Sequence, residues 1–386
     1  MKFLRNFSRI LIGLTFIFSG FVKAVDPMGS MYKFKEYFEA FGMSGLAGMA
    51  LFLGVLLFLC EFILGFSFLF NVKIKVTAWL MLLFMTFFTV LTFILAIKNP
   101  VSDCGCFGDA IKLTNWGTFY KNIVLMALTL IVFFQRKKFV NKFADVVQLS
   151  VLGLGAIIVL GIGYYSYNHL PLIDFMPWKK GAVIAKQILP QNEIAEIKLI
   201  YKNTETGEML EYTSKTLPWQ DTVFFKKLVF VEQKKKIIQE YKEAPIHDFM
   251  IDDADKNERN AEIIGNPNYQ FLFISHDLGS ADKSIFPALN EFYAQCRKDS
   301  ISMVGLCGSS FRDIDIFRLE NKANFDFFTV DETALKSVVR SNPGLVLLKN
   351  GVVLDKWHYH DFPTYEQFKS NMPKYEELLK QVKAKK

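Results

Sequence analysis

The chain has 386 residues, 51% of them hydrophobic, 40 phenylalanines and a formal net charge of +7. This composition is too apolar for one ordinary soluble domain, and the length is sufficient for two units. The positive charge lies in short loops beside apolar runs and in the Lys-rich tail. No basic stripe is interleaved with aromatic residues, so nucleic acid is excluded as an expected partner.

Five apolar runs in the first half of the chain approach or reach the length of a membrane span. A helix rises about 1.5 Å per residue, so about 20 residues cross the roughly 30 Å of hydrocarbon in a bilayer. The first run is not a cleaved signal peptide, because no small-x-small cleavage site follows it. We therefore predict five transmembrane helices in a lipid bilayer, at residues 10–25, 46–70, 76–97, 116–134 and 149–167.

The orientation follows from the Lys and Arg residues in the short flanking loops, because positive loops resist translocation. With a cytoplasmic N-terminus, nine of these residues lie inside: Lys2, Arg5, Arg9, Lys73, Lys75, Arg136, Lys137, Lys138 and Lys142. Only four lie outside: Lys33, Lys35, Lys98 and Lys112. Five crossings then place everything after residue 167 in the periplasm of a bacterial inner-membrane protein, in the same compartment as the loop that holds Cys104 and Cys106.

Three polar or small-residue features inside the spans need a reason. Glu61 lies in the middle of the second span, where an ionised carboxylate is costly and faces a partner or a wet cavity. It is a candidate functional site, and a protonated Glu that serves packing is the alternative. Lys23, at the end of the first span, is expected to extend to the membrane interface. The glycines of the fifth span favour close helix packing.

A family pattern is carried by residues 9–13, 16–20 and 23, by Glu61 with Gly65, and by the loop Ser102-Asp103-Cys104-Gly105-Cys106-Phe107-Gly108-Asp109. On these motifs, about residues 5–135 resemble the DoxX/MauE family of small four-helix membrane proteins. The CGCFG element is similar to the MauE branch. The resemblance implies an accessory role in the redox maturation of periplasmic proteins.

Cys104 and Cys106 form the candidate redox pair of the sequence. A disulfide between them would close a short, strained ring, and strain makes a disulfide easy to reduce and a good exchange partner. Gly105 and Gly108 permit the backbone angles of such a ring. A structural role for each cysteine is the alternative; no adjacent Cys or His completes a metal site, so no metal is assigned. Lys98 and Lys112 are the only Lys or Arg residues near this loop, so a lowered pKa of either thiol cannot be argued from the sequence.

The rest of the chain alternates strands and helices. Residues 171–244 read as a β-rich connecting segment with a hairpin across 204–207, and their role cannot be read from the sequence. From Pro245 onward we predict strands at 269–275, 301–306, 325–330, 345–348 and 352–357, and helices at 283–298, 313–321, 333–340 and 365–382. This order predicts an α/β layer fold.

The stretch from Pro245 to the C-terminus resembles a thioredoxin-like domain. Residues 342–344, followed by 345–351, look like the cis-proline loop and fourth strand of that family, and 283–291 looks like its first helix. The positions of a CxxC pair then fall on Gly279, Ser280, Ala281 and Asp282. Neither end is a cysteine, so this domain cannot supply the attacking thiolate and is expected to be redox-inactive.

Four other residues of this part receive weaker interpretations. Cys296 and Cys307 are expected to be separate buried thiols, although they could pair. His358 and His360 alternate along a strand and point the same way. Two ligands alone do not make a metal site.

The sequence therefore predicts an α-helical membrane bundle followed by an α/β thioredoxin-like domain. Its parts are a DoxX/MauE-like domain (1–140), a fifth transmembrane helix (141–170), the connecting segment (171–244) and the periplasmic domain (245–386). The favoured function is an envelope thiol/disulfide accessory in which the C-terminal domain recognises a periplasmic client or redox partner. A quinone is a candidate electron acceptor, and no other cofactor is indicated. A non-catalytic membrane scaffold is the alternative, as is a small-molecule transporter that uses Glu61, and enzymatic activity is left open.

Overall fold

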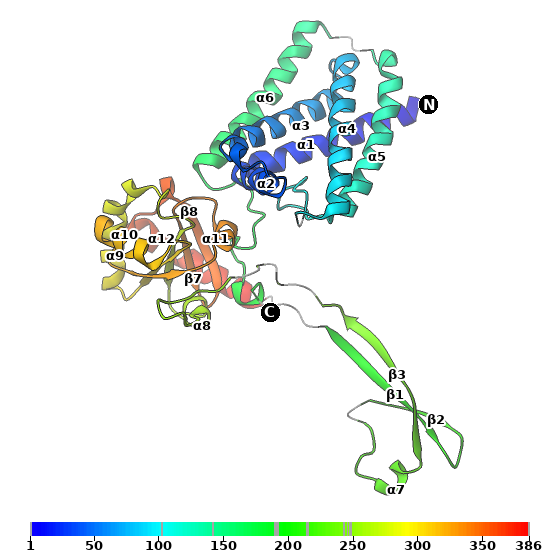
Figure 1. Cartoon of the computed structure of the whole chain (residues 1–386). Helices are drawn as coiled ribbons and strands as arrows, with labels where there is room; N and C mark the ends of the chain where they lie inside the picture. The colour runs from blue at the N-terminus through cyan, green and yellow to red at the C-terminus, as the bar shows by residue number, and fades with distance from the viewer. Residues whose placement is uncertain are drawn as a thin grey trace.

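The N-terminal part of the chain is a bundle of long helices (Figure 1). The computed structural model describes residues 2–101, 103–140, 143–188, 193–213, 216–241, 244, 246 and 249–384. Ser102, Lys142 and Pro245 of the sequence predictions lie outside this set. Among the described residues, five helical segments are long and apolar enough to cross a membrane, which confirms the predicted spans: α1 (Lys2–Val25), η1 with α3 (Ser44–Met49, Ala50–Phe70), α4 (Ile74–Lys98), α5 (Asn115–Phe134) and α6 (Asp145–Asn168).

A further helix, α2 (Pro27–Ala40), follows α1 directly and was not predicted from the sequence. Its mixed polar and apolar residues give no long apolar run. Its start is nevertheless specified locally, because the Asp26 carboxylate accepts a hydrogen bond of 2.8 Å from the Gly29 amide and Pro27 occupies the first turn. Helix α2 packs against α3.

Glycines bring α1 and α3 into backbone contact. A Cβ atom added at Gly65 would lie 2.5 Å from the Ile17 nitrogen and 2.8 Å from the Gly13 carbonyl oxygen. A Cβ at Gly20 would lie 2.8 Å from backbone atoms of Phe58. This close approach is typical of membrane helices that pack through small residues. It fixes the relative position of the two helices that carry Lys23 and Glu61.

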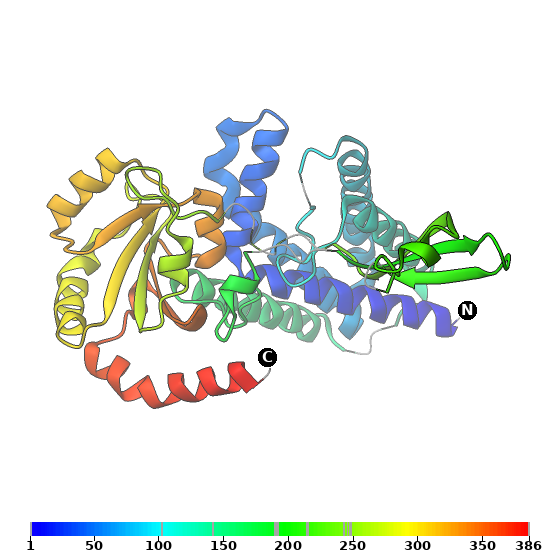
Figure 2. The same cartoon turned by 90° about the horizontal axis from the view of Figure 1, so that it is seen from below.

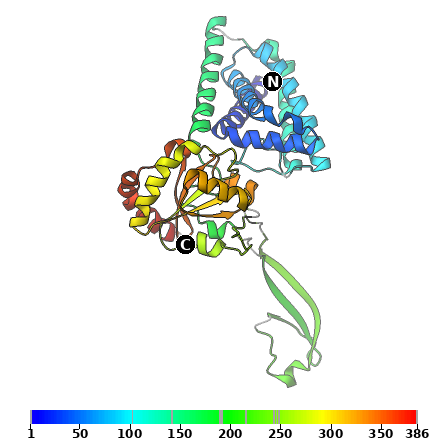
Figure 3. The same ribbon diagram turned by 60° about the vertical axis from the view of Figure 1, so that its left-hand side comes forward.

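Residues 193–241 include a separate three-stranded antiparallel sheet with the order β2-β1-β3, formed by β1 (Ile194–Asn203), β2 (Met209–Thr213) and β3 (Leu228–Gln239). Strands β1 and β2 form the hairpin predicted across 204–207. The short helix α7 (Thr222–Phe225) precedes β3. Figures 1 and 3 both show this sheet extending away from the rest of the molecule as an arm.

The C-terminal part is a module built on a five-stranded mixed sheet with the order β6-β5-β4-β7-β8. Strands β4, β5 and β6 are parallel to one another. Strand β7 runs antiparallel to β4, and β8 runs antiparallel to β7. The strands are β4 (Gln270–Ser275), β5 (Ser302–Cys307), β6 (Asp326–Thr329), β7 (Gly344–Lys349) and β8 (Val352–His358). The helices are α8 (Asn260–Ile264), α9 (Phe286–Lys298), α10 (Phe311–Asn321), α11 (Glu332–Val338) and α12 (Tyr365–Ala384).

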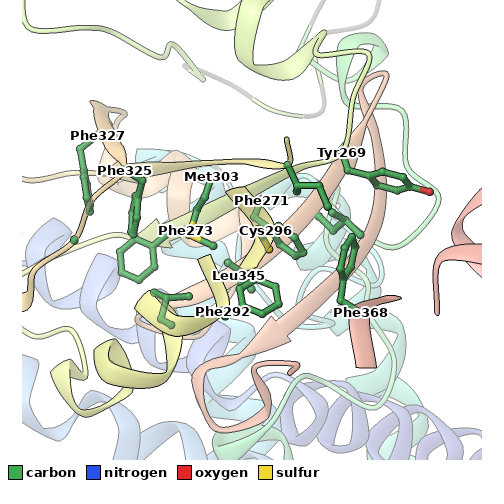
Figure 4. Packing of buried hydrophobic residues seen from close by; sticks show 14 of the residues in the cluster. Tyr269, Phe271, Phe273, Phe292, Cys296, Met303, Phe325, Phe327, Leu345 and Phe368 are labelled. Carbon is green, nitrogen blue, oxygen red and sulfur yellow. The ribbon is translucent and has the colours of Figure 1, made fainter. Parts of the chain in front are cut away.

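This sheet is covered on both sides, because successive residues of a strand point to opposite faces. Phe271 and Phe273 of β4 pack with α9, α10 and α12 in one core, which Figure 4 shows with Phe292 and Phe368 beside Phe271. Leu272 and Ile274 pack with α8 and α11 in the other core. Figure 2 shows α11, in orange, between the sheet and the blue helices of the bundle.

The segment that leaves the last membrane helix also belongs to this second core. Trp178 and Ile184 are fully buried in it, and the Ile184 amide donates a 2.8 Å hydrogen bond to the Gly351 carbonyl. The start of the predicted connecting segment therefore packs with the module, and the arm is inserted after it.

Candidate functional site

The loop between α4 and α5 brings Cys104 and Cys106 together. Their sulfur atoms lie 2.6 Å apart, and both are free cysteines. The Asp103 carboxylate accepts a 2.7 Å hydrogen bond from the Gly105 amide, and Gly105 has a φ of +63°. The aspartate and the left-handed glycine turn the chain so that both thiols point the same way.

Side chains from two helices hold the backbone of this loop. The Tyr37 hydroxyl of α2 donates a 2.6 Å hydrogen bond to the Cys104 carbonyl, and the Lys33 ammonium of α2 lies 3.5 Å from the Asp103 carboxylate. The Cys104 thiol lies 3.4 Å from the Thr118 hydroxyl of α5. The loop is thus fixed between α2 and α5.

A buried ion pair lies directly below the loop. The Lys23 ammonium of α1 lies 2.8 Å from the Glu61 carboxylate of α3, and both residues are less than a tenth exposed. Lys23 and Ser19 also donate hydrogen bonds to the Cys106 carbonyl, the Ser19 bond measuring 2.8 Å. The expectation that Lys23 extends to the membrane interface is wrong, because its charge is satisfied inside the bundle by Glu61 and the loop carbonyl.

The surroundings distinguish the two thiols electrostatically. A hydrogen bond from the Cys106 thiol is the main cause that lowers the pKa of Cys104 to about 6, against the opposing effect of burial. The same interaction, together with burial, raises the pKa of Cys106 well above its ordinary value. Cys104 is therefore the sulfur that carries the negative charge at neutral pH, and a thiolate is the attacking species in exchange reactions.

Both thiols and the ion pair line one cavity of about 240 Å³ inside the bundle. Its walls come from α1, α3, α4 and α5, and its roof comes from α2 and the cysteine loop. Most of the lining is aromatic or aliphatic, with Phe16, Phe34, Phe38, Phe84 and Phe88 among the lining residues. The cysteine pair and Glu61, which are more than 40 residues apart in the sequence, thus line one cavity.

The C-terminal module is tied to the same loop by Arg340. Its guanidinium lies 2.7 Å from the Asp109 carboxylate, at the end of the cysteine loop, and 2.9 Å from the Asp26 carboxylate at the start of α2. Burial opposes the charge, but the two carboxylates raise the pKa of Arg340 above its ordinary value. Arg340 is 13% exposed at its side chain, so this is a largely desolvated contact between module and bundle.

Helix α2 supplies the rest of this contact. The Tyr32 hydroxyl lies 3.4 Å from the His276 ring nitrogen at the end of β4, and the Lys336 ammonium of α11 lies 5.0 Å from the centre of the Tyr32 ring. Burial lowers the pKa of His276 to about 4, so this histidine is neutral at neutral pH. The module therefore contacts the bundle through the ends of its strands and through α11.

Residues 279–282, on which the sequence resemblance places the positions of a CxxC pair, lie beside the loop that holds Pro343. The Asn342–Pro343 peptide is cis. The Asp282 amide donates a 3.2 Å hydrogen bond to the Asn342 carbonyl, and the Asn342 side chain donates a 3.0 Å bond to the Ser280 hydroxyl. These two loops are adjacent in space, and no thiol lies in 279–282.

The remaining candidates show no site chemistry. Cys296 and Cys307 are fully buried free thiols in the first core of the module. The rings of His358 and His360 lie 4.9 Å apart, but the His360 ring nitrogen contacts the Asn168 carbonyl. Within the described part of the chain, no group of three or more His, Cys, Asp and Glu residues is placed to hold a metal ion.

Lys23, Tyr37 and Arg340 are the site residues that sequence reasoning missed. Lys23 was noticed but given a surface role, and its partner Glu61 was noticed separately. Their common depth in the membrane could have predicted that Lys23 and Glu61 form an ion pair, since two opposite charges at one level of a helical bundle are expected to pair. Tyr37 and Arg340 carried no comparable signal, because their partners are backbone or distant in sequence.

Comparison with protein families identifies a match in the N-terminal part of the chain. The family model described as "Methylamine utilisation protein MauE" matches residues 1–135, which contain the cavity, the ion pair and the cysteine loop. No curated protein and no solved structure matches the chain. With the five membrane-length helices, the family match supports a MauE-like multi-pass membrane protein.

Proposed function

We propose that the protein is a membrane-bound thiol/disulfide exchange accessory of the bacterial envelope, in which Cys104 and Cys106 are the working pair. The two adjacent sulfurs, presented by a loop that α1, α2 and α5 hold in place, are the observation that carries this proposal. In the reaction, a client dithiol loses two electrons and two protons, and the Cys104–Cys106 disulfide gains them to become two thiols.

The two thiols have different roles in this exchange. Cys104, with the lowered pKa, is the sulfur that attacks when the pair is reduced and, by microscopic reversibility, the sulfur that carries the client in the mixed disulfide. Cys106 is the second thiol, which closes or opens the ring. The Lys23–Glu61 pair positions the cysteine loop, because Lys23 donates a hydrogen bond to the Cys106 carbonyl and Glu61 holds Lys23 in place.

The C-terminal module, which we propose to be thioredoxin-like and redox-inactive, recognises the client. Its mixed five-stranded sheet, the cis-proline loop and the contact of Arg340 with Asp109 support this role. Because the module has no thiol at residues 279–282, it can position a client beside the cysteine loop without itself exchanging disulfides with that client.

The experiment that tests the exchange is a trapping assay in intact cells. With Cys106 replaced by Ala, the Cys104 thiolate can still attack the disulfide of an oxidised client, which is the reverse of the exchange. No second thiol can then release the client, so Cys104 should accumulate in a mixed disulfide that a reductant dissolves. The double variant C104A/C106A is the matched control and should give no adduct. Complete absence of an adduct from the Cys106→Ala protein at normal protein level would refute the exchange.

A non-catalytic scaffold is the second candidate, and the thiol-free segment 279–282 is the observation that favours it. The double variant separates the two functions. If C104A/C106A captures the same crosslinked partners and supports the same maturation as the wild type, the scaffold is correct. If partner capture persists but maturation stops, the exchange is correct.

We also propose that the N-terminus is cytoplasmic and that the module and the cysteine loop face the periplasm. The excess of Lys and Arg in the inner flanks and the contact between Arg340 and the loop support this orientation. Protease added to right-side-out spheroplasts should cleave the module from the membrane helices. Cleavage in inverted vesicles alone would reverse the assignment.

A further inference from the structure

The cavity beneath the cysteine loop has the features of a ligand site. A volume of about 240 Å³ is near the lower end of small-molecule pockets, which begin at about 300 Å³. It therefore suits a single ring system more than a long molecule. The lining phenylalanines of α1, α2 and α4 favour a flat, apolar ligand, because aromatic rings stack on one another.

The charges around the cavity are compensated, which favours a neutral ligand. The Lys23 ammonium is paired with Glu61, and the Lys33 ammonium lies 2.6 Å from the Glu36 carboxylate. The Lys121 ammonium lies 4.5 Å above the Phe107 ring. An anion or a cation would have to break one of these contacts, whereas a neutral molecule would not.

The cavity also reaches the surface of the helix bundle. Phe87, which lines it, is 61% exposed on the membrane-spanning helix α4, and the lining residues Phe41 and Met43 are 37% and 43% exposed. A ligand can thus enter from the hydrocarbon phase and leave an apolar tail there. Cys104 and Cys106 line the inner end of the same space.

We propose that this cavity binds the ring of a membrane quinone and that the quinone reoxidises the Cys104–Cys106 pair. This inference rests on the proposed exchange function and names its electron acceptor. The Cys104 thiolate gives up its electrons as the S–S bond to Cys106 forms. Two electrons pass from the pair to the quinone, one proton comes from the Cys106 thiol, and the second is taken up from water, which had received the Cys104 proton; the quinone becomes a quinol, and the atoms and charges balance.

The test uses the full-length protein in lipid nanodiscs, reduced and freed of reductant, with decylubiquinone as the probe. One quinone should disappear for every two thiols lost, as followed by quinone absorbance and by thiol titration. Leu91 of α4 lines the cavity, and Leu91→Trp should fill it and slow the reaction by roughly tenfold or more. The neighbouring Val90 is 55% exposed and is not among the lining residues, so Val90→Trp is the matched control and should react like the wild type.

A binding measurement keeps the proposal testable if the oxidation rates are ambiguous. The C104A/C106A protein cannot pass electrons but should still bind one decylubiquinone in equilibrium dialysis, and adding Leu91→Trp should abolish that binding. If decylubiquinone fails to bind, or reacts equally fast in the Leu91→Trp protein, the cavity is not a quinone site and a lipid chain is its occupant. Failure of quinone oxidation with intact client trapping would overturn this inference alone, whereas loss of client trapping would overturn the exchange function.

Discussion

Lys23 is a cation inside a membrane-spanning helix, and its surroundings explain how the chain accommodates it. Its ammonium contacts the Glu61 carboxylate, the Ser19 hydroxyl and the Cys106 carbonyl, and it is 5% exposed. All three contacts are needed, because a buried charge is stable only when it is paired and hydrogen-bonded. The pair thereby links the position of the cysteine loop to the packing of α1 on α3.

Removing one partner of this pair should destabilise the bundle strongly. Lys23→Met leaves the Glu61 carboxylate unpaired in the membrane, and we expect a loss of roughly 3–5 kcal/mol in the free energy of unfolding. The double variant K23M/E61L removes both charges and should be less destabilised than the single variant. Unfolding of the detergent-solubilised proteins measures this difference, and a double variant as unstable as Lys23→Met would show that the pair is not the cause.

The lowered pKa of Cys104 gives a test by pH. Since the thiolate reacts and the thiol does not, the rate of alkylation of reduced Cys104 should rise with pH and reach half its maximum near the pKa of about 6. Replacing Cys106 by Ala removes the hydrogen bond that is the main cause, so the midpoint should move up toward 9. Mass spectrometry of the labelled peptide measures both rates, and an unchanged midpoint would contradict the assignment.

At the scale of elements, the crossing of α1 and α3 determines the geometry of the site. Gly13 and Gly65 let the two backbones touch, and the helices then carry Lys23 and Glu61 to one level. The glycines of α6 are not all at helix contacts. Gly155 and Gly163 contact phenylalanines of α3, while a Cβ at Gly153 would meet open space. Small residues therefore matter at the contacts and not along the whole helix.

This division gives a matched pair of substitutions. Gly65→Ala places a methyl group against the backbone of α1 and should cost about 1–3 kcal/mol, as overpacking does in close-packed interiors. Gly153→Ala adds the same methyl group where nothing lies within 4 Å and should leave stability nearly unchanged. Thermal unfolding in one detergent compares them, and equal effects would exclude helix contact as the reason.

The elements differ in how well the sequence predicted them. The five spans and the strands of the module were found because long apolar runs and alternating residues are local signals. Helix α2 was missed because it is half-buried beside the bundle and owes its position to Tyr37, Lys33 and Tyr32, whose partners lie elsewhere in the chain. The Cys104–Cys106 pair and Glu61 were selected from the sequence separately, but their common cavity depends on helix packing that no local pattern records.

At the scale of the whole molecule, Arg340 is the main link between the module and the membrane bundle. The guanidinium joins Asp26 and Asp109, and Tyr32 of α2 stands beside it with its ring 5.5 Å away. The arm formed by β1, β2 and β3 extends away from this contact (Figure 3). The module is therefore held at one end of its sheet, above the cysteine loop.

Loss of this arginine should release the module while leaving it folded. Arg340→Ala removes this cation from the Asp26 and Asp109 carboxylates, so the module should contact the bundle less often. A bifunctional maleimide should then crosslink cysteines introduced by Tyr32→Cys and His276→Cys much less. The crosslinking background is C104S/C106S. Arg312→Ala, on the exposed surface of α10, is the control and should crosslink normally. Unchanged crosslinking in the Arg340→Ala protein would mean that other contacts suffice for docking.

The two carboxylates that Arg340 joins come from segments separated by two membrane helices, α3 and α4. They meet only after those helices have inserted and packed in the right order. The module is synthesised last, so its arginine encounters either a finished bundle with both acidic groups in place or an unfinished one that offers a single weak contact. Docking is thus conditional on correct assembly, and a misassembled bundle would leave the module undocked.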